Sequence, residues 1–115
     1  MRIANTTIAN AGDDGIAVFT NNKDVTIANT TIRDAQNGLH IFGSGNEVTM
    51  NDSTLAGMFV NGILIDNFAV NTSLNGTGNT AANATFGGNL CEDNGNAWTG
   101  TVVFDGVAIT NANCP

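Results

Sequence analysis

The stretch VTIANTTIRDAQNGLHIF, residues 25 to 42, decides the fold because the chain contains it in three versions. An uneven copy, MRIANTTIANAGDDGIAVF, begins at residue 1, and a third, VTMNDSTLAGMFVNGILID, begins at residue 48. The apolar residues of the copies align in columns with steps of 23 or 24 residues. These columns are Ile3, Ile27 and Met50; Ile8, Ile32 and Leu55; Ile16, Leu39 and Ile63; and Val18, Ile41 and Ile65. A fixed period of this length indicates a solenoid, in which each coil buries its apolar face against its neighbours.

Within one repeat the apolar residues have the spacing of strands. Val25 and Ile27, or Leu39 and Ile41, lie two residues apart and therefore point to the same side of an extended segment. Asn and Thr are abundant and there is a single Pro, which favours short strands joined by Asn-rich turns over helices. The sequence therefore predicts an all-β fold made of stacked coils.

Small and polar residues recur at two further places in the repeat, where the chain has to turn. The glycine column, which we expect to supply positive φ at a sharp corner, consists of Gly15, Gly38 and Gly62. The other column consists of Asn5, Asn29 and Asp52. Asn and Asp tolerate the left-handed conformation, and their stacked side chains can form hydrogen bonds along the column. We expect this second corner to carry an amide ladder.

The order of these features identifies a family resemblance. A leucine-rich consensus, a six-residue period and tandem nonapeptide repeats are all missing, so three other solenoid classes do not fit. An apolar strand, an Asn corner, a Thr-Ile strand, a polar corner and Gly-Ile-x-Ile resemble the right-handed parallel β-helix repeat of pectate lyases, polygalacturonases and many secreted proteins. The resemblance covers residues 1 to 70. It implies a right-handed single-stranded parallel β-helix of about five coils, which we expect to form one domain over residues 1–115.

The C-terminal third departs from the repeat. The register is lost over residues 71–101, which are rich in Asn, Gly, Thr and Ala and are predicted to form an irregular loop or coil. Trp98 either caps the end of the core or belongs to an irregular coil. Over residues 102–115 the pattern returns, because Phe104 and Ile109 have the spacing of two core residues of the second repeat. We expect one last coil there.

The two cysteines lie one repeat apart. Cys91 and Cys114 are separated by 23 residues, which would place them in adjacent coils within reach of a disulfide. Closing a loop of this size contributes about 3 kcal/mol to stability. A disulfide in turn predicts an extracellular or periplasmic location, whereas two free thiols would suit a reducing compartment.

The net charge and the start of the first repeat indicate which classes of partner to expect. With a net charge of −7 the chain would repel a phosphate backbone, so no nucleic acid is expected. No apolar run approaches the roughly 20 residues that span a bilayer, so no membrane span is expected. The first repeat begins at residue 1 without an amphipathic segment before it. Because open strand edges favour pairing, we expect either continuation in a longer β-helix or end-to-end self-association.

The outward side chains of the third strand in each repeat form a candidate binding face. They alternate with the apolar pair of that strand and are Ala17 with Phe19, His40 with Phe42, and Leu64 with Asp66. In sugar-acting β-helices this face holds the substrate. The resemblance therefore implies a polysaccharide or cell-surface glycan as partner, with Phe19, His40, Phe42 and Asp66 as ligand-binding residues. The alternative is that the two phenylalanines are a stacked pair covered by the long loop.

Two adjacent carboxylates are candidates for catalysis. DDGIAVF, then NGLHIFGS and NGILID, resemble the polygalacturonase order of an Asp-Asp pair, a Gly-His-Gly turn and an Arg-Ile-Lys strand. On that resemblance Asp13 and Asp14 stand where catalytic carboxylates would. His40 is displaced from the family position, and Leu64 and Asp66 replace the Arg and Lys. Without those cations an acidic pectin would be repelled.

Calcium is the one metal that the carboxylates suggest, and no resident metal is assigned. Asp24 and Glu47 should stack beside Lys23 on neighbouring coils and, with Asp13, Asp14 and Asp34, could hold calcium. We expect a non-catalytic secreted β-helix module with a structural, adhesion or carbohydrate-contacting role. The alternative is a fragment of a carbohydrate-active enzyme, a polysaccharide lyase or glycoside hydrolase of pectin-like substrates, whose catalytic residues lie partly outside this chain.

Overall fold

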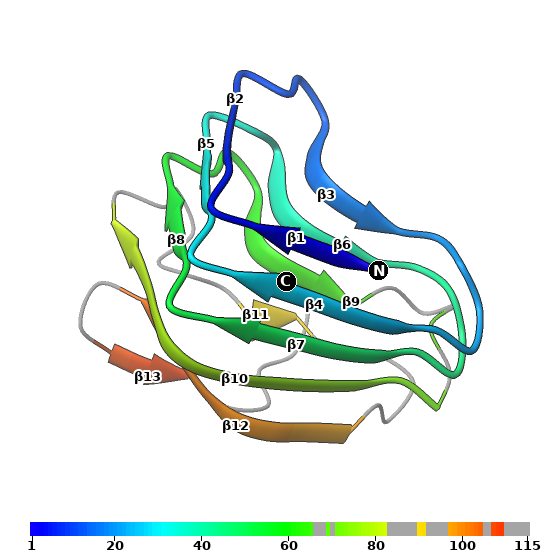
Figure 1. Ribbon diagram of the computed structural model, residues 1–115. Coiled ribbons are helices and arrows are strands. Elements are labelled where there is room, and N and C mark those ends of the chain that lie inside the picture. The colour runs from blue at the N-terminus through cyan, green and yellow to red at the C-terminus, as the bar shows by residue number, and fades with distance from the viewer. Residues whose placement is uncertain (66–68, 70, 83–89, 92–96, 105–106, 110–115) are drawn as a thin grey trace.

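A computed structural model describes residues 1–65, 69, 71–82, 90–91, 97–104 and 107–109. Every regular element among them is a strand, and none of them belongs to a helix that is long and apolar enough to cross a membrane. Three walls of parallel strands surround one core (Figure 1). The first wall contains β1 (Arg2–Ala4), β4 (Asp24–Ala28) and β7 (Glu47–Asn51), the second β2 (Thr7–Ala9), β5 (Thr31–Arg33) and β8 (Thr54–Ala56), and the third β3 (Asp14–Val18), β6 (Asn37–Ile41) and β9 (Asn61–Ile65).

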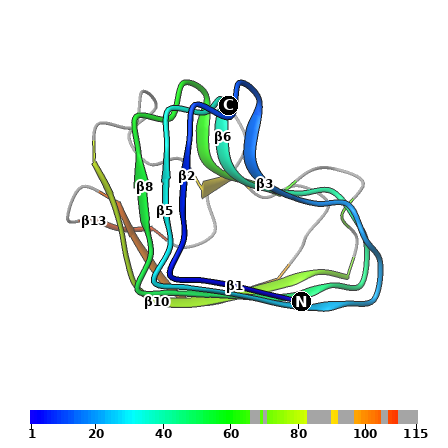
Figure 2. The same cartoon turned by 45° about the horizontal axis from the view of Figure 1, so that its top comes forward.

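The chain passes through the three walls in order, so each set of three strands is one coil (Figure 2). After three complete coils, β10 (Ser73–Ala82) pairs with β7 along its first half and with β8 along its second. β11 (Leu90–Cys91) pairs with β9, and β12 (Ala97–Phe104) pairs with β10. β13 (Val107–Ile109) then runs antiparallel to β12. The predicted all-β parallel solenoid is confirmed.

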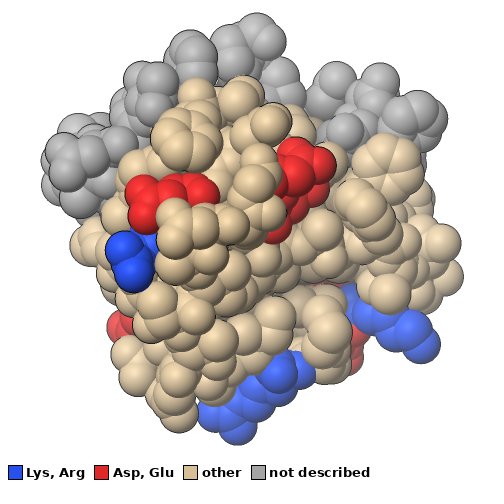
Figure 3. Space-filling view, turned by 90° about the horizontal axis from the view of Figure 1, so that it is seen from above, with Lys and Arg blue, Asp and Glu red and all other residues tan. Residues whose placement is uncertain are grey.

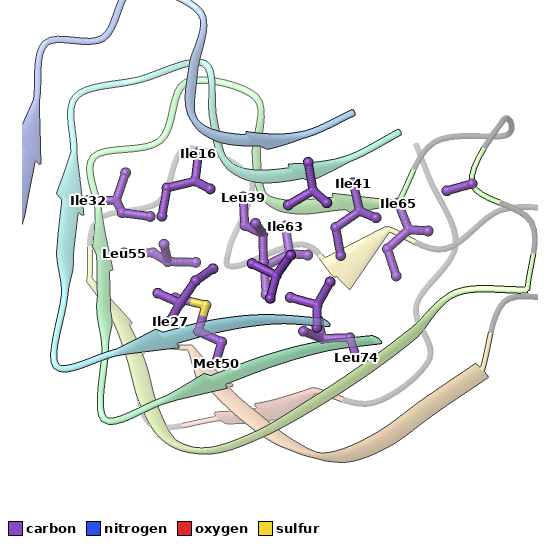
Figure 4. Close-up of a cluster of buried hydrophobic side chains, with 14 of the residues drawn as sticks. Ile16, Ile27, Ile32, Leu39, Ile41, Met50, Leu55, Ile63, Ile65 and Leu74 are labelled. Atoms are coloured by element: carbon purple, nitrogen blue, oxygen red, sulfur yellow. The ribbon is translucent and has the colours of Figure 1, made fainter. Parts of the chain in front are cut away.

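Neighbouring coils are in register residue for residue, as the repeat predicts. Ile27 stands opposite Ile3 on one side and opposite Met50 on the other. The other apolar columns align in the same way, and they are Ile8, Ile32 and Leu55; Ile16, Leu39 and Ile63; and Val18, Ile41 and Ile65. Figure 4 shows that the buried members of these columns that it labels, among them Ile27, Leu39 and Ile63, fill the space between the walls. Each fully buried side chain of this size contributes about 1.5–3 kcal/mol.

With the exception of Gly12, the residues with positive φ stack in columns at the corners between the walls. All of them are Asn, Asp or Gly, the residues that adopt this conformation at least cost. The columns are Asn5, Asn29, Asp52 and Gly78; Asn10, Asp34 and Gly57; and Asn22, Gly45 and Asn71. In the first column, Asn29 Nδ2 donates a hydrogen bond to Asn5 Oδ1 at 2.7 Å. The predicted left-handed Asn corner and its amide contact are confirmed.

The recurring glycine at the start of the third wall has a different role from the predicted one. Gly15 and Gly38 do not have positive φ. A Cβ atom on Gly38 would lie 2.6 Å from the carbonyl oxygen of Gly62 and 2.7 Å from Cδ2 of Leu55. A Cβ atom on Gly15 would meet the Ile32 side chain in the same way. Glycine is needed here because the backbone passes directly over the core, and not because the chain turns through a left-handed corner.

The prediction of an irregular segment over residues 71–101 is wrong for its first part. Ser73–Ala82 is strand β10, in register with the third coil. Its buried side chains include Leu74 but also Asn79, whose Oδ1 accepts a hydrogen bond from the backbone N–H of Ser53 at 3.0 Å. A buried amide satisfied by backbone groups stabilises a coil without giving an apolar signal. Hydrophobic periodicity therefore could not detect this strand.

The prediction of a last parallel coil over residues 102–115 is also wrong where the chain is described. Trp98 of β12 stands opposite Leu74 of β10. β12 therefore begins before residue 102, the predicted start of the last coil. Phe104 stands opposite Val107 in the antiparallel pair of β12 and β13, and residues 105–106 and 110–115 lie outside the described part. An antiparallel hairpin cannot continue parallel stacking. The structure consequently has three complete coils, followed by β10 and β11 stacked on the third coil and by β12 stacked on β10, in place of about five coils.

Truncation of a core column should destabilise the solenoid strongly. We expect Leu39→Ala to lower the free energy of unfolding by about 2 to 5 kcal/mol, because the side chain is completely buried and neighbouring coils hold the cavity open. Thr7→Ala, an exposed change on the second wall, should stay within about 0.5 kcal/mol. Denaturant unfolding followed by circular dichroism measures both, and equal effects would contradict the described core.

The corner column should distinguish backbone conformation from side-chain bonding. Asn29 has a φ of 47°, which alanine adopts only with strain and glycine adopts freely. We expect Asn29→Ala to lower the free energy of unfolding by about 1 kcal/mol more than Asn29→Gly, although both variants lose the bond to Asn5. If the two losses in denaturant unfolding were the same, the hydrogen bond and not the backbone would set the choice of residue.

Candidate functional site

The candidate site lies on the outward face of the third wall. Ala17, His40 and Leu64 stand opposite one another on β3, β6 and β9 and alternate with buried residues. Phe19 follows β3 directly, and Phe42 follows β6 directly. The backbone N–H of Phe42 donates to the carbonyl oxygen of Val18 at 2.9 Å, so the ladder between the two coils continues up to the rings.

The structure brings together three of the four residues predicted to bind a ligand. Phe19, His40 and Phe42, which we call the aromatic trio, contact one another edge to face. The ring centroids of Phe19 lie 5.1 Å from Phe42 and 5.6 Å from His40, and those of His40 and Phe42 lie 6.2 Å apart. Phe19 is 59% exposed, whereas His40 and Phe42 are half-buried. Edge-to-face contact is a favoured arrangement of aromatic rings and fixes their orientation.

A polar pair, formed by Asp14 and His40, lies at the border of the aromatic trio. Nδ1 of His40 lies 2.8 Å from Oδ2 of Asp14, and Nδ2 of Asn37 donates to Oδ1 of Asp14 at 2.9 Å. The side chains of Asp14 and His40 are only 11% and 13% exposed. Both oxygens of this carboxylate therefore have a partner within the protein. A carboxylate that binds Nδ1 holds the ring orientation and gives the neutral imidazole its acceptor character at Nε2.

The contact between Asp14 and His40 follows from the glycine at the start of the third wall. Asp14 pairs with Asn37 and Ile16 with Leu39, while the intervening Gly15 lies over the core. Two successive residues thus face inward, so Asp14 and Ala17 both face outward. His40 is opposite Ala17, and its Nδ1 reaches Oδ2 of Asp14 at 2.8 Å.

Sequence reasoning missed this pairing, although a signal for it exists. Asp14 was predicted as a candidate catalytic carboxylate beside Asp13, and Asn37 was not considered as a functional residue. Both residues precede the recurring glycine, which is the signal that they share a column. The reach from Asp14 to His40 was hidden because strict alternation along the strand assigns the two to opposite faces.

The two candidate catalytic carboxylates have different environments. The side chain of Asp13 is exposed, and its carbonyl oxygen accepts a hydrogen bond from the backbone N–H of Gln36 at 2.8 Å. Asp14 is largely buried between Asn37 and His40. The arrangement is therefore a carboxylate and imidazole pair beside a solvated carboxylate, and not two carboxylates that share one proton.

Two other predicted sites fall partly or wholly outside the described residues. Asp66, the fourth predicted ligand-binding residue, lies outside the described residues. Cys91 belongs to β11, with its backbone opposite Leu64, but Cys114 lies outside the described part of the chain. The Cys91–Cys114 disulfide and the location that it implies stay predictions.

The structure gives calcium no site among the residues that it describes. Asp24 and Glu47 stand opposite each other on β4 and β7, as the repeat predicts. His, Cys, Asp and Glu nevertheless form no group of three or more in the described residues that could hold a metal ion. Calcium therefore stays a prediction without a structural site.

Comparison with known proteins agrees with the stacked coils. Residues 1–78 match the family model described as a right handed beta helix region, which is more than half of the chain. The chain belongs to the right-handed β-helix family. No curated protein and no solved structure matches it significantly. The β-helix match extends past the predicted residue 70 into β10, in agreement with the register of that strand.

The polar pair can be tested through the geometry of its carboxylate. An amide at position 14 keeps an acceptor for Asn37 but presents an uncharged N–H donor to His40 in place of a carboxylate oxygen, so the charge-assisted contact with the imidazole is lost. We expect Asp14→Asn to lower the free energy of unfolding by about 1 to 2 kcal/mol. Asp13→Asn, the same change at the exposed neighbour, should stay within about 0.5 kcal/mol. Equal unfolding midpoints for the two variants would contradict the pairing.

Proposed function

We propose that this β-helix module binds a polysaccharide through the outward face of the third wall, with the aromatic trio as the contact surface. The observation that carries the proposal is the exposure of Phe19, at 59%, within a cluster that also contains His40 and Phe42. Aromatic rings that gather at a surface commonly mark a contact with a ligand or partner. The wall holds these rings in place, so little ordering is needed when a ligand binds.

The chemistry beside the rings favours a sugar over a purely apolar ligand. A sugar ring has apolar C–H faces and a rim of hydroxyl groups, so it needs an apolar surface together with oriented polar groups. The trio supplies the surface. Asp14, Asn37 and His40 form a hydrogen-bonded set directly beside it. Phe19 and Phe42 belong to successive coils, which places two rings along the solenoid axis and suits a chain of sugar units.

We further propose that the module is secreted and non-catalytic, with an adhesive or structural role on a glycan surface. Surface polysaccharides are found mainly outside cells. The predicted disulfide between Cys91 and Cys114 would also require an oxidising location. The surroundings of Asp14 argue against hydrolysis by a carboxylate pair, because both of its oxygens already have a partner: Asn37 donates to Oδ1, and Nδ1 of His40 lies 2.8 Å from Oδ2. A general acid of the glycosidase type needs a carboxyl group that can reach the glycosidic oxygen.

A carbohydrate-active enzyme fragment is the second candidate, and one observation favours it. The 2.8 Å contact of Asp14 with Nδ1 of His40 is the arrangement in which a carboxylate orients an imidazole base. An enzyme would release shorter products from a polysaccharide, and His40→Ala would abolish that release. Binding without product formation would support the module.

Removal of the exposed rings should weaken binding selectively. We expect the Phe19→Ala and Phe42→Ala double variant to lower the affinity for a soluble polysaccharide by at least about tenfold, because buried aromatic contacts dominate binding energies. Phe59→Ala is the matched control, since Phe59 is similarly exposed, at 54%, in the turn between β8 and β9. Affinity electrophoresis on a panel of glycans measures both variants. An equal loss with Phe59→Ala would indicate non-specific apolar contact and contradict the proposed face.

A further inference from the structure

The Lys and Arg side chains of the chain all lie away from the aromatic trio. There are three Lys and Arg residues in the whole sequence, and the structure places each of them. Arg2 is in β1 on the first wall. Arg33 is in β5 on the second wall, with its guanidinium 3.6 Å from the carboxylate of Asp34. Lys23 is exposed beyond the corner at Asn22, where the chain enters the first wall.

The surface shows the same distribution. Figure 3 looks at the end of the solenoid and shows the basic side chains as separate patches along the edge of this view, not as a continuous basic strip. Since every Lys and Arg of the sequence is among the described residues, the rest of the chain adds no further one. Recognition of sugar carboxylates or sulfates depends on such cations, above all on bidentate arginine.

Negative charge, in contrast, lies next to the trio. The Asp14 carboxylate contacts His40, and the exposed Asp13 precedes it in the chain. The side chain of Asp14 is only 11% exposed, so its charge is poorly screened by solvent. The chain as a whole carries a net charge of −7. An acid group brought onto the trio would therefore meet like charge, both locally and in the long-range field.

We infer that the polysaccharide bound by this face carries no acid groups, and that affinity rises in the order uronate chain, uncharged chain, amino-sugar chain. The inference rests on the proposed function and names its ligand class. Uncharged hydroxyl groups can exchange hydrogen bonds with the polar set beside the rings without electrostatic cost. Protonated amino groups gain from the same carboxylates that repel a uronate.

The test compares three oligosaccharides of equal length with the full chain near neutral pH. The probes are a β-1,4-linked glucose hexamer, the corresponding glucosamine hexamer and a galacturonate hexamer, each titrated by calorimetry at low and at high salt. At low salt we expect the galacturonate to bind at least about tenfold more weakly than the glucose hexamer, and the glucosamine to bind most tightly. At high salt the three affinities should converge, because added ions screen the charges.

A charge variant separates the local effect from net charge. Ala17 is exposed and directly opposite His40, so Ala17→Lys adds a cation to the face itself. We expect this variant to bind the galacturonate at least severalfold better than wild type. Thr7→Lys adds the same charge on the second wall and should leave galacturonate binding close to the wild-type value. An equal gain in both variants would overturn the local part of the inference.

The outcomes distinguish the inference from the proposed function. If the galacturonate binds as tightly as the glucose hexamer at low salt and the Phe19→Ala and Phe42→Ala double variant abolishes this binding, the face is a glycan site but the inference on charge is wrong. If none of the three probes binds to wild type or to the Ala17→Lys variant, the proposed function itself fails. Binding of the uncharged and amino-sugar chains alone supports both.

Discussion

Parallel hydrogen bonding between coils is the constraint on which the rest of the structure depends. Each residue of a coil stands directly above its counterpart one repeat later, as Ile3, Ile27 and Met50 do. Residues of one column need similar burial and the same backbone conformation. Apolar residues therefore recur inside the walls, and residues that accept positive φ recur at the corners. The buried polar groups obey the same rule, since the backbone N–H of Thr30 binds the Ser53 hydroxyl and that of Ser53 binds Asn79.

Much of this architecture could be predicted from the sequence because columns leave a periodic signal. The apolar columns and the left-handed Asn corner both follow from residue type and spacing alone. β10 could not be predicted in this way, because Asn79 replaces an apolar residue and is satisfied by backbone groups of the third coil. Gly38 was assigned to a turn because its close approach to Leu55 is a property of packing between coils, which spacing does not reveal.

The candidate site was only partly predictable for a related reason. Alternation along a strand was enough to place Phe19, His40 and Phe42 on one face. It was misleading for Asp14, because the two inward residues after it shift the pattern by one position. The outward positions are also those that stacking constrains least. Membership of the right-handed β-helix family consequently specifies the scaffold, while the chemistry of the face depends on a few side chains particular to this chain.

The long strand β10 has a mechanical consequence. The first coil is joined to the second, and the second to the third, by three short strands in separate walls, so tension on residue 1 would open these contacts one strand at a time. β10 instead continues around the corner at Gly78 and pairs with both β7 and β8. The third coil can be peeled away only when both walls give way together. β10 would therefore act as a clasp, and the contacts of the first coil would yield to a pulling force before those between the third coil and β10.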